Sequence, residues 1–166
     1  MQRLKMINLN QKGLTLVEII IYFTLLSIIL VIITDLLIKV TESSLESTSK
    51  SAVETEGEII IKRISYDIHR AESIAIPVNP GNVSPNLELV INGTNIKYSL
   101  IGSSITIDDG AADPITSNLV KATLLSFEKV GSVASPTIKI SFTLQATKNT
   151  KQGAQVKNFE TVVALR

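Results

Sequence analysis

The chain starts with a long apolar run and ends with alternating apolar and polar positions. Residues 19–33 carry no charged side chain, and the apolar segment around them covers residues 14–34, which is 21 positions. As a helix rising 1.5 Å per residue this segment reaches about 31 Å, close to the roughly 30 Å thickness of a bilayer hydrocarbon core. The pattern therefore predicts one membrane-spanning helix, to which we assign residues 14–39.

The polar segment after Lys39 is expected to continue the helix. It contains neither Pro nor Gly before Gly57, and apolar residues beyond that point recur at spacings of three and four, as on one face of an amphipathic helix. This apolar stripe consists of Ile60, Ile61, Ile64, Ile68, Ala71 and Ile74. We predict a single helix from about Thr15 to about Ala75, with residues 40–75 as its amphipathic part; a bend or fraying near Gly57 stays open.

Residues 76–166 predict a β-rich head. Pro77 and Pro80 end the helix, because proline cannot continue the helical hydrogen-bond ladder. Strands are expected at residues 87–91, 96–101, 105–108, 124–130, 137–147 and 159–165. Asn92-Gly93 supplies the left-handed backbone conformation that a tight turn between the first two strands requires.

The strand at residues 137–147 alternates strictly between apolar and polar side chains. Its apolar positions are Ile138, Ile140, Phe142 and Leu144. Such alternation indicates one buried and one solvated face, and the apolar stripe of the helix is the natural cover for the buried face. The predicted fold class is α+β, with a long N-terminal helix packed on a mostly antiparallel sheet.

Charge is distributed unevenly. The net charge is only +1, but residues 1–13 hold Arg3, Lys5 and Lys12 and no acid. A basic N-terminal flank predicts a cytoplasmic N-terminus, with the chain after about Lys39 on the other side of the membrane. No basic patch argues for nucleic-acid binding, and the absence of cysteine excludes disulfides and thiolate sites.

Glu18 is an acid just inside the apolar run. At the centre of a bilayer an acid costs roughly 2.5 to 3.5 kcal/mol on insertion scales, so one that persists is generally functional and paired with a cation. Glu18 therefore predicts a cationic partner. The alternative is an incidental acid at the membrane boundary.

Gly13 suggests where that cation originates. A secretory signal peptide would be cut after its apolar stretch, but residues 34–40 offer no A-x-A pattern there. The small residue lies before the stretch, and cleavage after Gly13 would create an α-amine at Leu14. Leu14 is four positions before Glu18, and helix positions i and i+4 share a face. Processing would then supply the cation.

Seven consecutive residues carry a resemblance to a known family. They are Lys12, Gly13, Leu14, Thr15, Leu16, Val17 and Glu18. With the apolar continuation, this segment resembles the processing motif of type IV prepilins and type II secretion pseudopilins. The resemblance implies that a prepilin peptidase/N-methyltransferase removes residues 1–13, cuts after Gly13 and methylates Leu14, and that Glu18 contacts the N-terminal amine of a neighbouring subunit. The segment departs from the family pattern at two positions. Leu14 stands where phenylalanine is commonest, and the family's frequent proline near the end of the span is absent, with Asp35 in its place.

Looser patterns resemble J-type pseudopilins and W-type minor pilins. They lie at residues 64–71, 119–127 and 161–166. The resemblance implies a pilin-like fold and a minor subunit that has a single span in the bacterial cytoplasmic membrane. That subunit then joins other pilins or pseudopilins in a periplasmic or extracellular filament. Secretion, DNA uptake as in competence, motility and adhesion remain open as the filament's task.

The leading hypothesis is a structural subunit of a type IV pilus or type II secretion-like filament. The alternative is a single-pass anchored module for binding or adhesion, and an anchored enzyme has no support. His69 is the only histidine, so no triad and no two-histidine metal site can be built, and it is expected to be solvated. Asp67 and Arg70 are expected to form an exposed pair. We predict no catalytic residue, no metal and no cofactor.

Two further groups of polar residues, the hydroxyl residues of the apolar run and the acids at residues 108–110, are expected to have local structural roles. Thr24, Ser27 and Thr34 are expected to bond their own helix backbone rather than a neighbouring helix. Asp108-Asp109-Gly110 is expected to form a turn, because it lacks the alternating ligands and the closing glutamate of a calcium loop.

Overall fold

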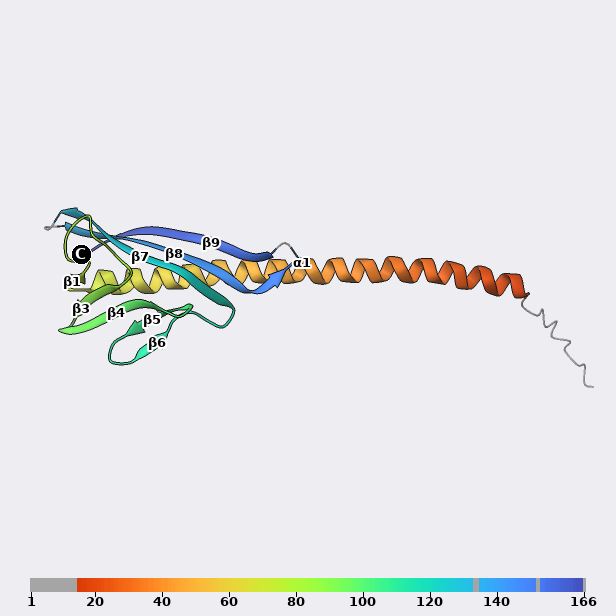
Figure 1. Cartoon of the computed structure of the whole chain (residues 1–166), viewed down its shortest axis with the longest axis horizontal. Coiled ribbons are helices and arrows are strands. Elements are labelled where there is room, and N and C mark those ends of the chain that lie inside the picture. Colours follow the sequence, from red (N-terminus) through yellow and green to blue (C-terminus); the bar gives the residue numbers. More distant parts are fainter. Residues whose placement is uncertain (1–14, 133–134, 152, 166) are drawn as a thin grey trace, which may run out of the picture. The chain divides into compact units, whose positions relative to one another are not determined.

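The computed structural model describes residues 15–132, 135–151 and 153–165. It contains one long helix, α1 (Leu16–Arg70), followed by antiparallel strands, so the predicted α+β class is confirmed. The chain divides into two compact units, residues 1–41 and residues 42–166. Figure 1 shows the elements coloured along the sequence.

The helix α1 begins at Leu16 and is helical without interruption through Asp35 and Gly57. It ends at Arg70, earlier than the predicted end near Ala75. The Glu72 N–H donates to the Val90 carbonyl at 2.8 Å, so the backbone is already bonded to a strand two residues after the helix ends. The strand β1 (Ser73–Ile76) follows directly, which means that the end of the predicted apolar stripe is a strand and not a helix.

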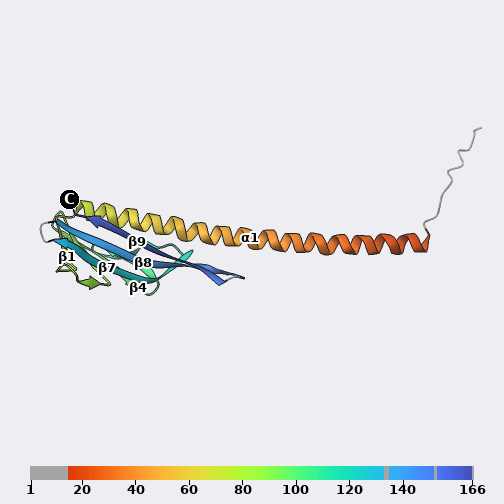
Figure 2. The ribbon, with the colours of Figure 1, turned by 90° about the horizontal axis from the view of Figure 1, so that it is seen from above.

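Two antiparallel sheets follow α1. The first has the order β1-β3-β4-β5-β6 and includes β3 (Leu87–Ile91), β4 (Thr94–Ile101), β5 (Ser104–Asp108) and β6 (Ala112–Pro114). The second has the order β2-β7-β8-β9 and includes β2 (Val83–Ser84), β7 (Val120–Ser132), β8 (Ser135–Thr150) and β9 (Gly153–Ala164). Strands of both sheets lie on the same side of residues 42–70 of α1 (Figure 2).

All six predicted strands are present, as β3, β4, β5, β7, β8 and β9. The turn between β3 and β4 has Asn92 at φ 51° and Gly93 at φ 73°, which is the left-handed conformation expected for this pair. The short strands β1, β2 and β6 were not predicted. The β6 strand contains Pro114 and lies at a sheet edge, where a missing backbone donor is tolerated.

The core joins the helix to both sheets. On the helix side Val53, Ile60, Ile64 and Ile68 are at most 2% exposed. On β8 the four apolar positions of the predicted alternation are at most 1% exposed, and they belong to the same cluster as the helix residues, so the predicted cover of this face is confirmed.

Gly57 of α1 lies against Phe159 of β9. A Cβ atom placed on Gly57 would lie 2.1 Å from Cζ of Phe159, which is far inside van der Waals contact. The Phe159 ring is itself stacked on Phe142, with centroids 5.1 Å apart and planes at 14°. Gly57 therefore provides room for an aromatic ring, and the helix does not break there.

Asp67 differs from its prediction as an exposed partner of Arg70. It is 2% exposed and accepts a hydrogen bond from the Tyr98 hydroxyl on β4, and Arg63 Nε lies 3.3 Å from the same carboxylate. Burial and the neighbouring carboxylate raise the pKa of Tyr98. Arg70 instead lies over the Tyr66 ring, 5.0 Å from its centroid. The predicted pair is wrong because the sheet supplies Asp67 with a buried partner.

Candidate functional site at the first turn of the helix

The predicted site residues fall into two groups. Lys12, Gly13 and Leu14 lie outside the described residues, so cleavage after Gly13 and an amine at Leu14 stay predictions. The remaining four, residues 15–18, form the start of α1, and the structure places them together in its first turn.

Thr15 caps the helix. Its Oγ1 accepts a hydrogen bond from the Glu18 N–H at 3.3 Å, and its carbonyl accepts one from the Ile19 N–H at 3.2 Å. A threonine three residues before a glutamate is the sequence signal of a capping box, so this contact was readable from the sequence but was not predicted. The cap places Glu18 in the first turn, where the helix dipole favours a negative charge.

The Glu18 carboxylate has one side-chain partner in the described part of the chain. The Tyr22 hydroxyl, one helical turn further on, donates to Glu18 Oε1 at 3.1 Å. Within residues 15–132, 135–151 and 153–165 no basic side chain forms an ion pair with Glu18. The cation that the sequence calls for is therefore not provided by this part of the chain.

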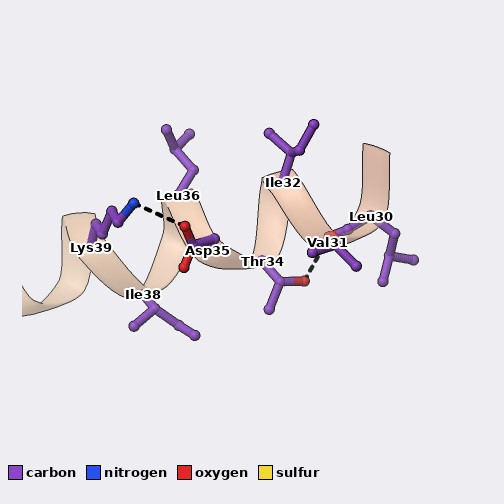
Figure 3. A pocket seen from close by; sticks show the side chains of 8 residues that line it. All are labelled: Leu30, Val31, Ile32, Thr34, Asp35, Leu36, Ile38 and Lys39. Atoms are coloured by element: carbon purple, nitrogen blue, oxygen red, sulfur yellow. Dashed lines mark hydrogen bonds and ion pairs between the residues drawn. The ribbon is translucent and has the colours of Figure 1, made fainter. Parts of the chain in front are cut away.

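Asp35 provides a direct comparison on the same helix. Lys39, four residues later, places its Nζ 2.9 Å from Asp35 Oδ2, as Figure 3 shows. Glu18 has Tyr22 at the corresponding i+4 position, which is a hydrogen-bond donor without a charge. Of these two acids, only Asp35 is neutralised from within the described helix.

The side chains around Glu18 form a continuous apolar surface. The large apolar residues from Leu16 to Ile38 are each 43–75% exposed within the chain. An 18-residue window of α1 has a mean hydropathy of 2.9, and the helix is long enough to cross a membrane. Surfaces of this size require lipid or other protein as a partner.

The hydroxyl residues of this segment bond their own backbone. Thr24, Ser27 and Thr34 each donate to the carbonyl four residues earlier at 2.8 Å, as predicted. They therefore satisfy themselves within α1 and leave no unmet donor in the apolar surface.

Residues 42–165 offer no comparable chemical site in the part of the chain that the structure describes. His69 is exposed, and no group of three or more His, Cys, Asp or Glu side chains there is placed to hold a metal ion. The Gly110 N–H donates to Asp108 Oδ1 at 3.1 Å, which is the geometry of a local turn. Among the residues that the structure describes, Glu18 stays the candidate for the predicted assembly contact.

Comparison with known proteins gives one match. Residues 8–34 match the family model described as the prokaryotic N-terminal methylation motif. The matched segment contains every residue of the predicted processing motif and the whole apolar segment, residues 14–34. No curated protein and no solved structure matches the chain significantly.

Proposed function

We propose that this chain, a member of the type IV prepilin and pseudopilin family by its N-terminal methylation motif, is a minor subunit of a filament assembled through its N-terminal helix. A prepilin peptidase/N-methyltransferase removes residues 1–13 by cutting after Gly13 and methylates the new N-terminus at Leu14. Glu18 is the assembly contact and accepts the α-amine of a neighbouring subunit. Residues 19–33 form the core of the filament.

The observation that supports this proposal is an acid without a cation at the start of an exposed apolar helix. Glu18 is bonded only to a neutral hydroxyl among the described residues, and the surrounding apolar side chains are exposed. Transferring such a helix into a bundle of like helices stabilises it only if the carboxylate is paired, because an unpaired buried charge is strongly unfavourable. A wrong axial register leaves the charge unpaired, so the contact selects one stagger.

The membrane anchor sets the location. One apolar helix fits a single span, and the basic N-terminal flank favours a cytoplasmic N-terminus. We place the chain in the bacterial cytoplasmic membrane before assembly and in a periplasmic or extracellular filament afterwards. The looser patterns at residues 64–71, 119–127 and 161–166 support a minor rather than a major subunit.

A structural subunit is favoured over the alternatives. An anchored binding module needs only the span, and it would tolerate loss of Glu18. The methylation motif is characteristic of subunits rather than enzymes. The partners implied are therefore the peptidase and other pilins or pseudopilins.

The first test is processing. The full chain is co-expressed with a prepilin peptidase, and the mass of its N-terminus is measured. We expect a chain that begins at methylated Leu14. A chain that keeps residues 1–13 under these conditions would refute the proposal.

The second test compares two isosteric neutralisations on one helix, Glu18→Gln and Asp35→Asn. Removing one partner of a buried charge pair costs about 3 to 5 kcal/mol, so we expect Glu18→Gln to reduce incorporation into filaments about a hundredfold or more. Asp35→Asn removes an exposed pair with Lys39 and should leave incorporation within about twofold of wild type. Equal incorporation of both variants would exclude Glu18 as the assembly contact.

A further inference from the structure

Tyr22 is the residue at the N-terminal site that the proposed function does not use. Its hydroxyl donates to Glu18 Oε1 at 3.1 Å from one turn further along α1. The other hydroxyls of the apolar run, on Thr24, Ser27 and Thr34, bond backbone carbonyls of the same helix. Within the apolar run, Tyr22 therefore differs from them in directing its hydroxyl to an ionisable side chain.

The hydrogen bond leaves half of the carboxylate available. A carboxylate has two oxygens and about four acceptor sites. Tyr22 occupies Oε1, and no donor among the described residues contacts Oε2. A second donor approaching from outside the chain can therefore bind Oε2 without displacing the tyrosine.

The same contact restricts the glutamate side chain. A free glutamate has several rotatable bonds, and ordering such a side chain on binding costs conformational entropy. Thr15 fixes the backbone at Glu18 through the helix cap, and Tyr22 fixes the carboxylate. Both ends of the side chain are thus held before any partner arrives.

From this geometry we propose that Tyr22 is a positioning residue for assembly: it holds Glu18 Oε1 so that Oε2 is presented to the α-amine of the incoming subunit. This inference rests on the proposed function. Tyr22 also gives the carboxylate a hydrogen-bond donor while the subunit waits in the membrane.

The contact itself is tested without assembly partners. The full-length chain in lipid vesicles is treated with dicyclohexylcarbodiimide, a lipid-soluble reagent that adds to a carboxyl oxygen, and the labelling rate at Glu18 is followed by peptide mass. Tyr22→Phe frees Oε1 and should raise this rate about two- to tenfold, the range that one net hydrogen bond allows. Glu18→Gln must abolish the labelled peptide. Tyr66→Phe removes the hydroxyl of an exposed tyrosine near the C-terminal end of α1 and should leave the rate unchanged.

The role of Tyr22 in assembly is tested by measuring how much of each variant is incorporated into filaments. Tyr22→Phe should lower the fraction of subunits in filaments about two- to tenfold, with cleavage after Gly13 unchanged. Tyr66→Phe is again the matched control and should assemble normally. An unchanged labelling rate in Tyr22→Phe would overturn the contact, and unchanged incorporation would overturn the positioning role.

The two proposals fail in different ways. If Glu18→Gln assembles normally, the proposed function fails, whatever Tyr22→Phe does. If Glu18→Gln is defective and Tyr22→Phe assembles like wild type, only the inference about Tyr22 fails.

Discussion

Replacing Gly57 by alanine tests the packing of the head more directly than any other single change. In an exposed helix this substitution stabilises by up to about 1 kcal/mol, because alanine has the higher helix propensity. In this chain the added Cβ would lie 2.1 Å from Cζ and 2.3 Å from Cε1 of Phe159. One of the two groups must move.

The size of the effect depends on how far the Phe159 ring can retreat. The ring is stacked on Phe142, whose side chain is 1% exposed, so it has a firm neighbour on one face. Inserting a methyl group into such packing costs typically 1 to 3 kcal/mol. After subtraction of the propensity gain of about 1 kcal/mol, we expect Gly57→Ala to lower the free energy of unfolding by up to about 2 kcal/mol.

The assay is urea unfolding of the full chain in mild detergent, followed by circular dichroism. Phe159→Leu removes the ring atoms that the new Cβ meets, so Gly57→Ala should be neutral or stabilising in the Phe159→Leu background. The two single variants and the double variant form a double-mutant cycle that isolates this contact. Ser51→Ala, at an exposed position of the same helix, reports the propensity effect alone.

A higher unfolding midpoint for Gly57→Ala in the wild-type background would refute this reasoning. It would mean that helix propensity outweighs the contact, and hence that the Phe159 ring does not rest on Gly57. Additivity in the cycle would lead to the same conclusion.

The hydroxyl groups of Tyr98 and Tyr22, each bonded to a carboxylate, provide further predictions. Tyr98→Phe leaves buried Asp67 without its hydroxyl donor and should cost about 1 to 3 kcal/mol in urea unfolding. Because the folded pKa of Tyr98 is raised, its contribution to stability is fully present below the ordinary tyrosine pKa of 10.0 and is lost as pH rises above it, so stability should fall less steeply above pH 10.0 in Tyr98→Phe than in wild type. Tyr22→Lys gives Glu18 a cation at i+4 on the same helix, as Lys39 does for Asp35. This variant should therefore block incorporation into filaments and leave leader cleavage intact. Normal incorporation would contradict the need for an amine from another subunit.

Local patterns were sufficient for most of the fold. The apolar run and the stripe from Ile60 onward predicted α1, and alternation predicted the long strands because side-chain periodicity follows directly from backbone geometry. Asn92-Gly93 predicted its turn for the same reason. At the N-terminal site, the Thr15 cap and the Tyr22 contact also lie within one helical turn of Glu18, so their spacing was a readable signal.

Contacts between distant segments decided the rest. The spacing of Ala71 and Ile74 still fits a helix, but β3 takes the backbone N–H of Glu72. Asp67 carries no local sign of burial, since its partner Tyr98 lies 31 residues away. Gly57 looks like a helix breaker in the sequence, and its role is visible only once β9 brings an aromatic ring against it. Each of these outcomes depends on tertiary packing, which overrides local preference.

The two acids of the apolar helix differ in whether a cationic side chain of the same helix lies beside them. Glu18 and Asp35 are 17 positions apart, or about 26 Å along a helix, so each lies near one end of the apolar run. Asp35 has Lys39 at 2.9 Å and can remain at a membrane surface as a solvated pair. Glu18 has a phenol in the equivalent place, so its charge is held but not neutralised. No side chain in the described part of the chain neutralises Glu18, so a cation from outside these residues would stabilise this end of the helix, as the proposed assembly contact requires.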